Sequence, residues 1–273
     1  YVLLLLKPKT LKDFLNRLPS EKTQSYKSLM INENLIDNNI VFLDDSITSI
    51  LNKIEEKKNF TLDEKEEITN GIQVQQECVN KKSLEILGKN YRLNEGIFNL
   101  TTEELEYLNL NQNELEIVKP LFTSNEINRY NTKRENKNWV IYTDSSFKDI
   151  EKMNNYPNLK YHLDRFKDVI TTDNKPYGIH RARNEYFFKG EKILSLRKCV
   201  NRPLFSYVDF DSYVNQVYYV IKSNRINLKY LTALLNSNLI AFWLKYKGKM
   251  QGNNFQVDKE PLLNIPILYI ENN

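Results

Sequence analysis

The chain has 273 residues, which is long enough to bury a hydrophobic core and to form one or two domains. Its hydrophobic fraction of 41% and charged fraction of 27% are ordinary for a soluble globular protein. The net charge of +4 is a mild bias, too small to indicate a nucleic-acid-binding protein by itself.

Cysteine content and hydropathy indicate the cellular compartment of the protein and whether it spans a membrane. The two cysteines, Cys78 and Cys199, form no CxxC motif or metal cluster, which is typical of a protein from a reducing cytoplasm. The apolar run at residues 2–6 is too short for a signal peptide or a membrane span, and no other run approaches the roughly 18 apolar residues that a span needs. We therefore expect a cytoplasmic protein without a membrane partner. Because the chain begins at Tyr1 within an apolar pattern, we also expect a piece of a longer protein.

Two helices are predicted near the N-terminus. The first spans residues 10–18 and is capped by Thr10. The second spans residues 46–57, with Ile47, Ile50, Leu51 and Ile54 on one face. A short helix or turn is expected at residues 62–68.

The middle of the chain mixes strands with short helices. Strands are predicted at residues 96–100 and 139–143, and the first is followed by a capping-box sequence that begins at Thr101. A helix at residues 113–120 should end at its proline. Another helix should follow Pro157, and its His162 is predicted to be a packed or surface residue, not a ligand.

In the last third of the chain, alternating patterns predict strands at residues 205–209 and 215–221, which we expect to pair. A long apolar helix, capped by Asn227, should run from residue 228 to about residue 246, and residues 262–267 should form a closing strand. The predicted fold class is α+β, with mixed or antiparallel sheets flanked by helices.

A basic and aromatic stretch lies at residues 176–202, with seven Lys or Arg residues and two Glu. The surrounding region, residues 126–205, has 17 basic and 10 acidic residues, so most of the positive excess lies there. Arg181 and Arg183 are two residues apart and would point to one side of an extended segment. A guanidinium can bind a phosphate, or the O6 and N7 atoms of guanine, with two hydrogen bonds. The alternative is a solvated basic hairpin that binds nothing.

The stretch PYGIHRARNEYFFKGEKILSLRK resembles the centre of the TaqI-like C-terminal specificity domain, the target-recognition part of adenine-specific DNA methyltransferases and single-chain restriction-modification enzymes. The other matching pieces occur in the family's order, from about residue 65 to residue 268: Gly71-Ile72-Gln73, residues 156–166, residues 209–218, residues 231–237 and residues 256–266. One departure is Val74-Gln75, where the family usually has Thr-Gly.

The resemblance implies a target-recognition-like fold and a domain plan. Residues 1–60 would be a helical connector leading out of a catalytic domain, residues 61–135 the first part of the recognition domain, and residues 136–273 the second part, with basic DNA-facing loops and a buried helix. The implied partners are double-stranded DNA and a methyltransferase domain of the same parent chain. The parent would use S-adenosylmethionine, and magnesium if it also cleaves DNA.

The candidate DNA-binding residues fall into two groups. The first would read base edges or stack on them, and the second would position the phosphates. The base group is His180, Arg181, Arg183, Gln73 and Tyr177, with Arg129 as a further contact, and the phosphate group is Lys189, Lys192, Arg197 and Lys198. For Gln73, a surface amide that reads no base is the favoured interpretation from the sequence.

No catalytic site is predicted in this chain. Adenine methylation needs a glycine-rich cofactor loop and an Asn-Pro-Pro-Tyr-type loop, and neither is present among its residues. An Asp…Glu-x-Lys nuclease pattern ending at Lys57 falls in an apparent helix, where residues two apart diverge. The alternatives to duplex DNA recognition are a protein-interaction domain that uses the apolar helix face at residues 231–242, if the fold leaves it uncovered, and an RNA-binding domain.

Overall fold

The computed structural model describes residues 45–270. The chain divides into two units between Glu56 and Lys57, and each is described by itself. In the first unit, helix α3 (Asp45–Glu55) confirms the predicted second helix. Leu51 is its buried residue, whereas Ile50 is 45% exposed. The predicted helix at residues 10–18 lies outside the described residues.

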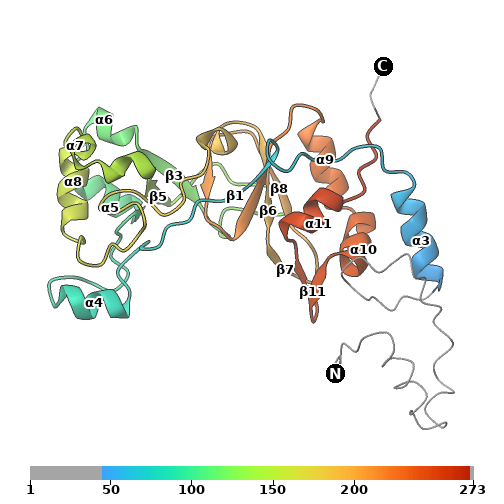
Figure 1. Ribbon diagram of the computed structural model, residues 1–273, viewed down its shortest axis with the longest axis horizontal. Helices are drawn as coiled ribbons and strands as arrows, with labels where there is room; N and C mark the ends of the chain where they lie inside the picture. The colour runs from blue at the N-terminus through green and yellow to red at the C-terminus, as the bar shows by residue number, and fades with distance from the viewer. Residues whose placement is uncertain (1–44, 271–273) are drawn as a thin grey trace, which may run out of the picture. The chain divides into compact units, whose positions relative to one another are not determined.

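The second unit contains three sheets (Figure 1). The five-stranded sheet has the order β1-β10-β6-β8-β4, the four-stranded sheet has the order β2-β5-β3-β9, and the three-stranded sheet has the order β11-β12-β7. The strands β4 and β8 pair in parallel, as do β3 and β9, and the other pairs are antiparallel. The predicted α+β class with mixed sheets is therefore confirmed. The strands are β1 (Ile68–Asn70), β2 (Asn99–Thr101), β3 (Val118–Phe122), β4 (Tyr130–Asn131), β5 (Asn138–Ile141), β6 (Lys192–Leu196), β7 (Lys198–Val200), β8 (Phe205–Val208), β9 (Tyr213–Val214), β10 (Tyr218–Ile221), β11 (Lys249–Gln251) and β12 (Asn254–Gln256).

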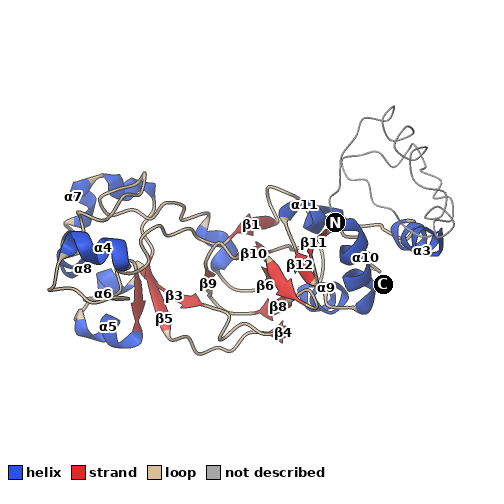
Figure 2. Ribbon diagram, turned by 90° about the horizontal axis from the view of Figure 1, so that it is seen from below, coloured by secondary structure: helices blue, strands red, loops and turns tan. Residues whose placement is uncertain are grey.

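Short helices cover these sheets. In the second unit they are α4 (Lys81–Leu87), α5 (Thr102–Tyr107), α6 (Gln112–Leu115), α7 (Ile150–Met153), α8 (Pro157–Asp164), α9 (Leu228–Leu235), α10 (Asn238–Lys247) and α11 (Lys259–Asn264), with 3₁₀ turns η2 (Ser145–Lys148) and η3 (Glu185–Phe188). Helix α5 contacts β2 and β5, and α9 contacts β6 and β8. Figure 2 shows β10, β6 and β8 side by side in the five-stranded sheet. One hydrophobic core extends from β3 and β5 to β6 and β10, so these two sheets fold together.

The predicted helix at residues 113–120 is wrong beyond residue 115. Residues 118–122 form β3, whose Val118, Leu121 and Phe122 are buried. Pro120 is tolerated there because β9 pairs only with Leu121 and Phe122, leaving the Pro120 side of the strand without a partner that needs its N–H.

Helix α6 also caps a second helix, α8. Its capping box pairs Asn111 with Glu114, and the Glu114 carboxylate is fully buried. That carboxylate also accepts the backbone N–H groups of Asn158 (2.6 Å) and Leu159 (3.1 Å), in the first turn of α8. Tyr156 provides no side-chain cap for α8, so Glu114 satisfies these N–H groups instead.

The predicted long helix after Asn227 is two helices. Asn227 caps α9 as expected, but Asn236 ends it. The Asn236 side chain exchanges hydrogen bonds with the backbone of Phe205 (3.2 and 2.8 Å), and Ser237 then caps α10. Because Asn236 pairs with the first residue of β8, the helix ends there and does not continue. Leu231 and Leu235 are buried, whereas Leu239 on α10 is 47% exposed.

Three other predictions have mixed outcomes. The two strands at residues 205–209 and 215–221 are present as β8 and β10, but both pair with β6 between them. The closing strand at residues 262–267 is wrong, because residues 259–264 form α11 and only Ile267 bridges, to Phe60. The predicted strand–capping-box pair is confirmed by β2 and by Thr101, which caps α5.

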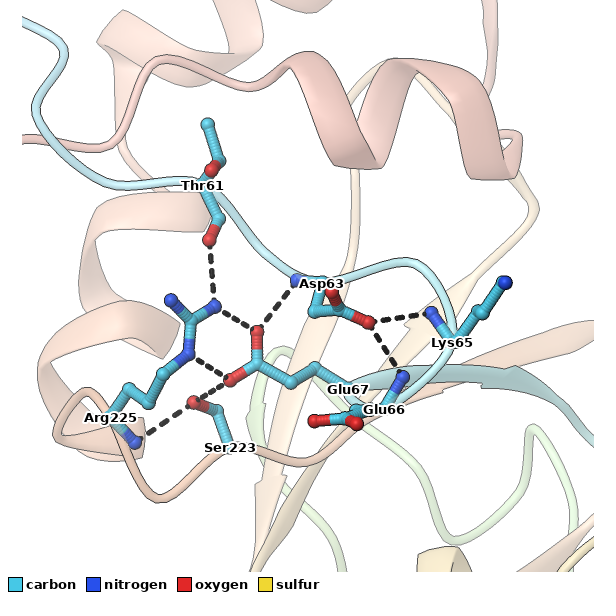
Figure 3. A network of polar contacts seen from close by, with 7 residues as sticks. All are labelled: Thr61, Asp63, Lys65, Glu66, Glu67, Ser223 and Arg225. Atoms are coloured by element: carbon cyan, nitrogen blue, oxygen red, sulfur yellow. Dashed lines mark hydrogen bonds and ion pairs between the residues drawn. The ribbon is translucent and has the colours of Figure 1, made fainter.

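A polar network joins the segment before β1 to the loop after β10 (Figure 3). The guanidinium of Arg225 binds both oxygens of the buried Glu67 carboxylate and donates to the Thr61 carbonyl (2.8 Å). Ser223 and the backbone N–H of Asp63 (2.7 Å) complete the set of donors around Glu67. This network fixes the entry of the chain into the five-stranded sheet.

Replacing Arg225 by Met should lower the free energy of unfolding by about 1–3 kcal/mol, because the buried Glu67 carboxylate loses its charged donor. Burial opposes the ionisation of Glu67, but hydrogen bonds from Arg225 and Ser223 bring its pKa below the ordinary value of 4.5. The stabilisation is therefore present above that value and lost as the pH falls below it, so the difference between variant and wild type should shrink in acid. Urea denaturation at several pH values measures this.

Arg134→Met is the matched control, because Arg134 and Asp209 form an exposed ion pair (2.7 Å). Exposed pairs contribute about 0–1 kcal/mol. Equal losses of stability in the two variants would contradict a special role for the Glu67–Arg225 pair.

Candidate nucleic-acid interface

Residues 181–183, here called the arginine loop, are anchored to the segment that follows β1. The backbone N–H of Gln73 donates to the Arg181 carbonyl (2.9 Å), and the Arg181 N–H donates to the Gln73 carbonyl (3.1 Å). Arg181 is exposed, Arg183 and Gln73 are half-buried, and Ala182 between the arginines is buried. The loop therefore presents its arginines from a backbone that is held in place.

Gly71 allows the neighbouring segment to lie where it does. A Cβ atom at this position would lie 2.1 Å from the Asn215 carbonyl oxygen and 2.5 Å from that of Val214. The Ile72 N–H donates to the Val214 carbonyl (2.8 Å) in the same contact. The glycine is therefore needed for this close backbone approach.

Tyr142 holds the arginine loop from the other side. Its hydroxyl lies 3.1 Å from the carbonyl oxygens of both Ala182 and Arg183, to which it donates. Its ring packs edge-on against Tyr213, with the ring centroids 5.1 Å apart. Burial raises the pKa of Tyr142, so the hydroxyl keeps the proton that it donates.

Arg183 has a backbone φ of 68°, in the left-handed region that non-glycine residues rarely adopt. Such a conformation costs on the order of 1–3 kcal/mol and persists only where the surroundings impose it. Burial, followed by the charge of Arg181, lowers the pKa of Arg183. Within residues 45–270, no carboxylate is recorded beside either guanidinium. Two like charges on one short loop without an acidic partner favour an anionic ligand.

Glu185, in η3, organises the lysines next to the loop. Its carboxylate lies 3.3 Å from the Lys119 Nζ and 3.2 Å from the Lys189 Nζ, and it accepts the Tyr213 hydroxyl (2.5 Å). Burial opposes its ionisation, but the hydrogen bonds from Tyr213 and Lys189 and the charge of Lys119 hold its pKa below the usual range. Lys189, a predicted phosphate contact, is thus exposed but already paired with a carboxylate.

Two predicted site residues are buried, and their assignments need correction. Lys192 is 0% exposed, and its Nζ donates to the carbonyls of Gly190 (2.8 Å) and Phe210 (2.6 Å), so it does not face a phosphate. Tyr177 is 4% exposed, and its hydroxyl donates to Asp164 (2.7 Å), so its ring offers no stacking face.

The remaining predicted residues lie in different surroundings. The Nδ1 atom of His180 is 3.3 Å from Asp173, and the Arg129 guanidinium donates to the Pro203 carbonyl (3.0 Å). Arg197 lies 3.3 Å from Asp258 and over the Tyr219 ring. Lys198 is exposed on β7. His162, predicted not to be a ligand, is packed, with its Nε2 atom 2.9 Å from the Ile97 carbonyl oxygen.

The structure brings Gln73, Arg181 and Arg183 together from segments more than a hundred residues apart, although no recorded contact joins them to Arg129, Arg197 or Lys198. Sequence reasoning missed Tyr142 and Glu185, which position the loop and its lysines. Neither residue has a local signal, because Tyr142 belongs to an ordinary strand segment and Glu185 to the basic stretch itself.

The described residues contain no group of three or more His, Cys, Asp or Glu side chains arranged to hold a metal ion. In the same part of the chain, no helix is both long enough and apolar enough to cross a membrane.

Comparison with known families places these residues in context. Residues 119–267 match the family described as the TaqI-like C-terminal specificity domain. The chain belongs to this family. The match includes the arginine loop, Tyr142 and Glu185, whereas Gly71 and Gln73 precede it.

Two methyltransferases have sequences similar to part of this chain. Type II methyltransferase M.HincII of Haemophilus influenzae is 31% identical over 131 residues, which cover 42% of this chain and 26% of that protein. Type II methyltransferase M.HindII of Haemophilus influenzae strain Rd is 29% identical over 134 residues, covering 42% and 25%. The matched region spans about a quarter of the length of these curated relatives.

A solved structure has a similar fold. It is the Type IIL restriction-modification enzyme MmeI in complex with DNA, with a TM-score of 0.51 and 13% sequence identity, covering 80% of this chain and 26% of that one. At this identity the likeness concerns the fold alone, and it agrees with the α+β arrangement described above.

The buried Lys192 should make the stability of the specificity domain depend on pH. Burial lowers its pKa from 10.5 to about 7. Between these two values the unfolded chain holds the proton that the folded chain has released, so the free energy of unfolding should rise with pH across this window. Lys192→Met should flatten that rise in urea denaturation curves, whereas Lys167→Met, at an exposed lysine, should not. Parallel pH dependence in wild type and Lys192→Met would contradict this assignment.

Proposed function

We propose that this specificity domain recognises double-stranded DNA by sequence, with the arginine loop as its base-reading element. The observation that supports this most strongly is a loop on an anchored backbone that carries two arginines, Arg181 exposed and Arg183 half-buried, with no acidic partner recorded for either in the described residues. Guanidinium forks suit the O6 and N7 atoms of guanine, and a rigid loop loses little entropy on binding.

The basic residues divide into two roles under this proposal. Arg181 and Arg183, with His180 beside them in sequence, read base edges. Lys189, Arg197 and Lys198 contact phosphates and set the position of the duplex. Lys192 has no part in either role, because its Nζ is buried against two carbonyl groups.

The chemistry that acts on DNA belongs to another domain of the parent protein in this proposal. The parent is an adenine DNA methyltransferase that uses S-adenosylmethionine, and it uses magnesium if it also cleaves; the chain itself is not catalytic. The residues here do not fit that cofactor. The seven glycines are dispersed singly through the sequence, so they form no glycine-rich loop. The space beside Gly71 is occupied by the backbone of residues 214–215. A cytoplasmic location accords with this function.

A protein-interaction role receives no comparable support. It depended on an uncovered apolar helix face, but α9 contacts β6 and β8, and its Leu231 and Leu235 are fully buried. The exposed positive charge of the arginine loop has no explanation in that alternative.

Substitutions at Arg181 and Lys198 should separate base reading from phosphate contact. Arg181→Ala should remove about 1–3 kcal/mol of discrimination at one base pair of the preferred site. Lys198→Ala should weaken binding to all duplexes alike and reduce the slope of log K against log salt by about one. Fluorescence anisotropy with a preferred and an unrelated duplex, titrated with salt, measures both effects.

Lys167→Ala, which removes an exposed lysine outside the proposed interface, is the control and should change neither quantity. If Arg181→Ala weakens every sequence equally, the loop does not read bases. If the wild-type chain binds duplex DNA with no salt dependence, phosphate contact is excluded as a source of its affinity.

A further inference from the structure

We infer that Gln73 and Arg181 act as one composite reader of two neighbouring base pairs, an A·T pair contacted by Gln73 and a G·C pair contacted by Arg181. The inference rests on the proposed recognition of duplex DNA and assigns part of the target sequence. The two residues are 108 positions apart in sequence, and only the fold joins them.

The backbone geometry determines where the two side chains point. Gln73 and Arg181 form an antiparallel bridge in which each N–H donates to the other residue's carbonyl, at 2.9 and 3.1 Å. Residues that exchange both hydrogen bonds have Cα atoms about 5.5 Å apart. Their side chains leave the same face of the bridge as a directly opposed pair. An amide and a guanidinium therefore project side by side.

Both side chains are available to a ligand. Arg181 is exposed and Gln73 is half-buried, and within residues 45–270 no hydrogen bond or ion pair is recorded for the side chain of either. The nearby Gln76 is different, because its amide donates to Thr171 (2.7 Å) and accepts the Thr171 N–H (3.3 Å). The segment thus contains one glutamine with a structural role and one that is presented beside an arginine.

Separate backbone contacts hold Gln73 and Arg181 in place. Gln73 follows Ile72, which bridges to Asn215, and Gly71, which allows that approach. Arg181 precedes Ala182, whose carbonyl accepts the Tyr142 hydroxyl. A reader that is fixed before binding distinguishes bases by geometry, because neither side chain has a mobile backbone that could adapt to a wrong base.

The chemistry of the two side chains identifies the bases. An arginine binds guanine O6 and N7 with two hydrogen bonds, and a glutamine binds adenine N6 and N7 in the same manner. Successive bases along a strand are about 3.4 Å apart, so two side chains that start about 5.5 Å apart can reach neighbouring base pairs. The preferred site of this chain should therefore contain an A·T pair beside a G·C pair.

The test selects preferred duplexes from a random pool with the full wild-type chain and then measures the affinity for every single-base-pair change in that site. Gln73→Leu should lose about tenfold discrimination at one A·T pair and keep the preference elsewhere. Arg181→Gln should change the preference at the adjacent position from G·C to A·T. This change of preference is a gain that misfolding cannot imitate. Gln112→Leu, at an exposed glutamine on α6, should leave the whole preference unchanged.

The outcomes separate the inference from the proposed function. If the wild type selects a site but Gln73→Leu and Arg181→Gln act at positions that are not adjacent, or alter no base preference, the composite reader is wrong and DNA recognition stands. If the wild type selects no sequence at all, the proposed function is wrong and the inference is overturned with it.

Discussion

The approach of Gly71 to the backbone of Val214 and Asn215 is the constraint on which the interface depends. No side chain fits between these segments, because a Cβ at residue 71 would lie 2.1 Å from a carbonyl oxygen. The contact links the end of β1 to the connection between β9 and β10, and thus links the five-stranded sheet to the four-stranded one. Gln73 reaches its partner Arg181 only because Gly71 and Ile72 are fixed in this way.

The arginine loop then illustrates how a folded scaffold supports an unfavourable local arrangement. Arg183 adopts a left-handed backbone conformation, and burial followed by the charge of Arg181 lowers its pKa. The cost is offset by the hydrogen bonds of Tyr142 and by the buried Ala182 side chain. Strained backbone and unneutralised charge at one place are typical of a binding site, where a ligand supplies the missing partner.

Much of the fold could be predicted from the sequence, because local signals determine it. The capping box at Thr101 and Glu104 and the Asn227 cap each depend on residues within one turn, and both are present. The errors arise where a distant segment competes with local preference. The β8 end pairs with Asn236 and divides a predicted helix in two, and the strand pairing of residues 118–122 overrides the apparent helix before Pro120.

In the candidate site, too, local features could be predicted from the sequence and long-range contacts could not. The basic stretch was evident from composition, but the extended geometry assumed from the spacing of Arg181 and Arg183 is not kept, because Arg183 has a left-handed backbone with φ of 68°. Burial was not evident: Lys192 looks like any other lysine in a basic turn, yet it pairs with Val208 of β8, and its ammonium group is buried against the carbonyls of Gly190 and Phe210. The supports from Tyr142 and Glu185 depend on long-range contacts that no spacing encodes.

The most direct test of sequence reading by the arginine loop is chemical protection of guanine N7 in the preferred duplex, since N7 lies in the major groove, where an arginine would bind it. Dimethyl sulfate methylation of the bound duplex should spare one guanine with the wild-type chain, and that guanine should become reactive again with Arg181→Ala at a concentration that keeps the duplex bound. Full reactivity of every guanine N7 in the wild-type complex would contradict major-groove reading by this loop.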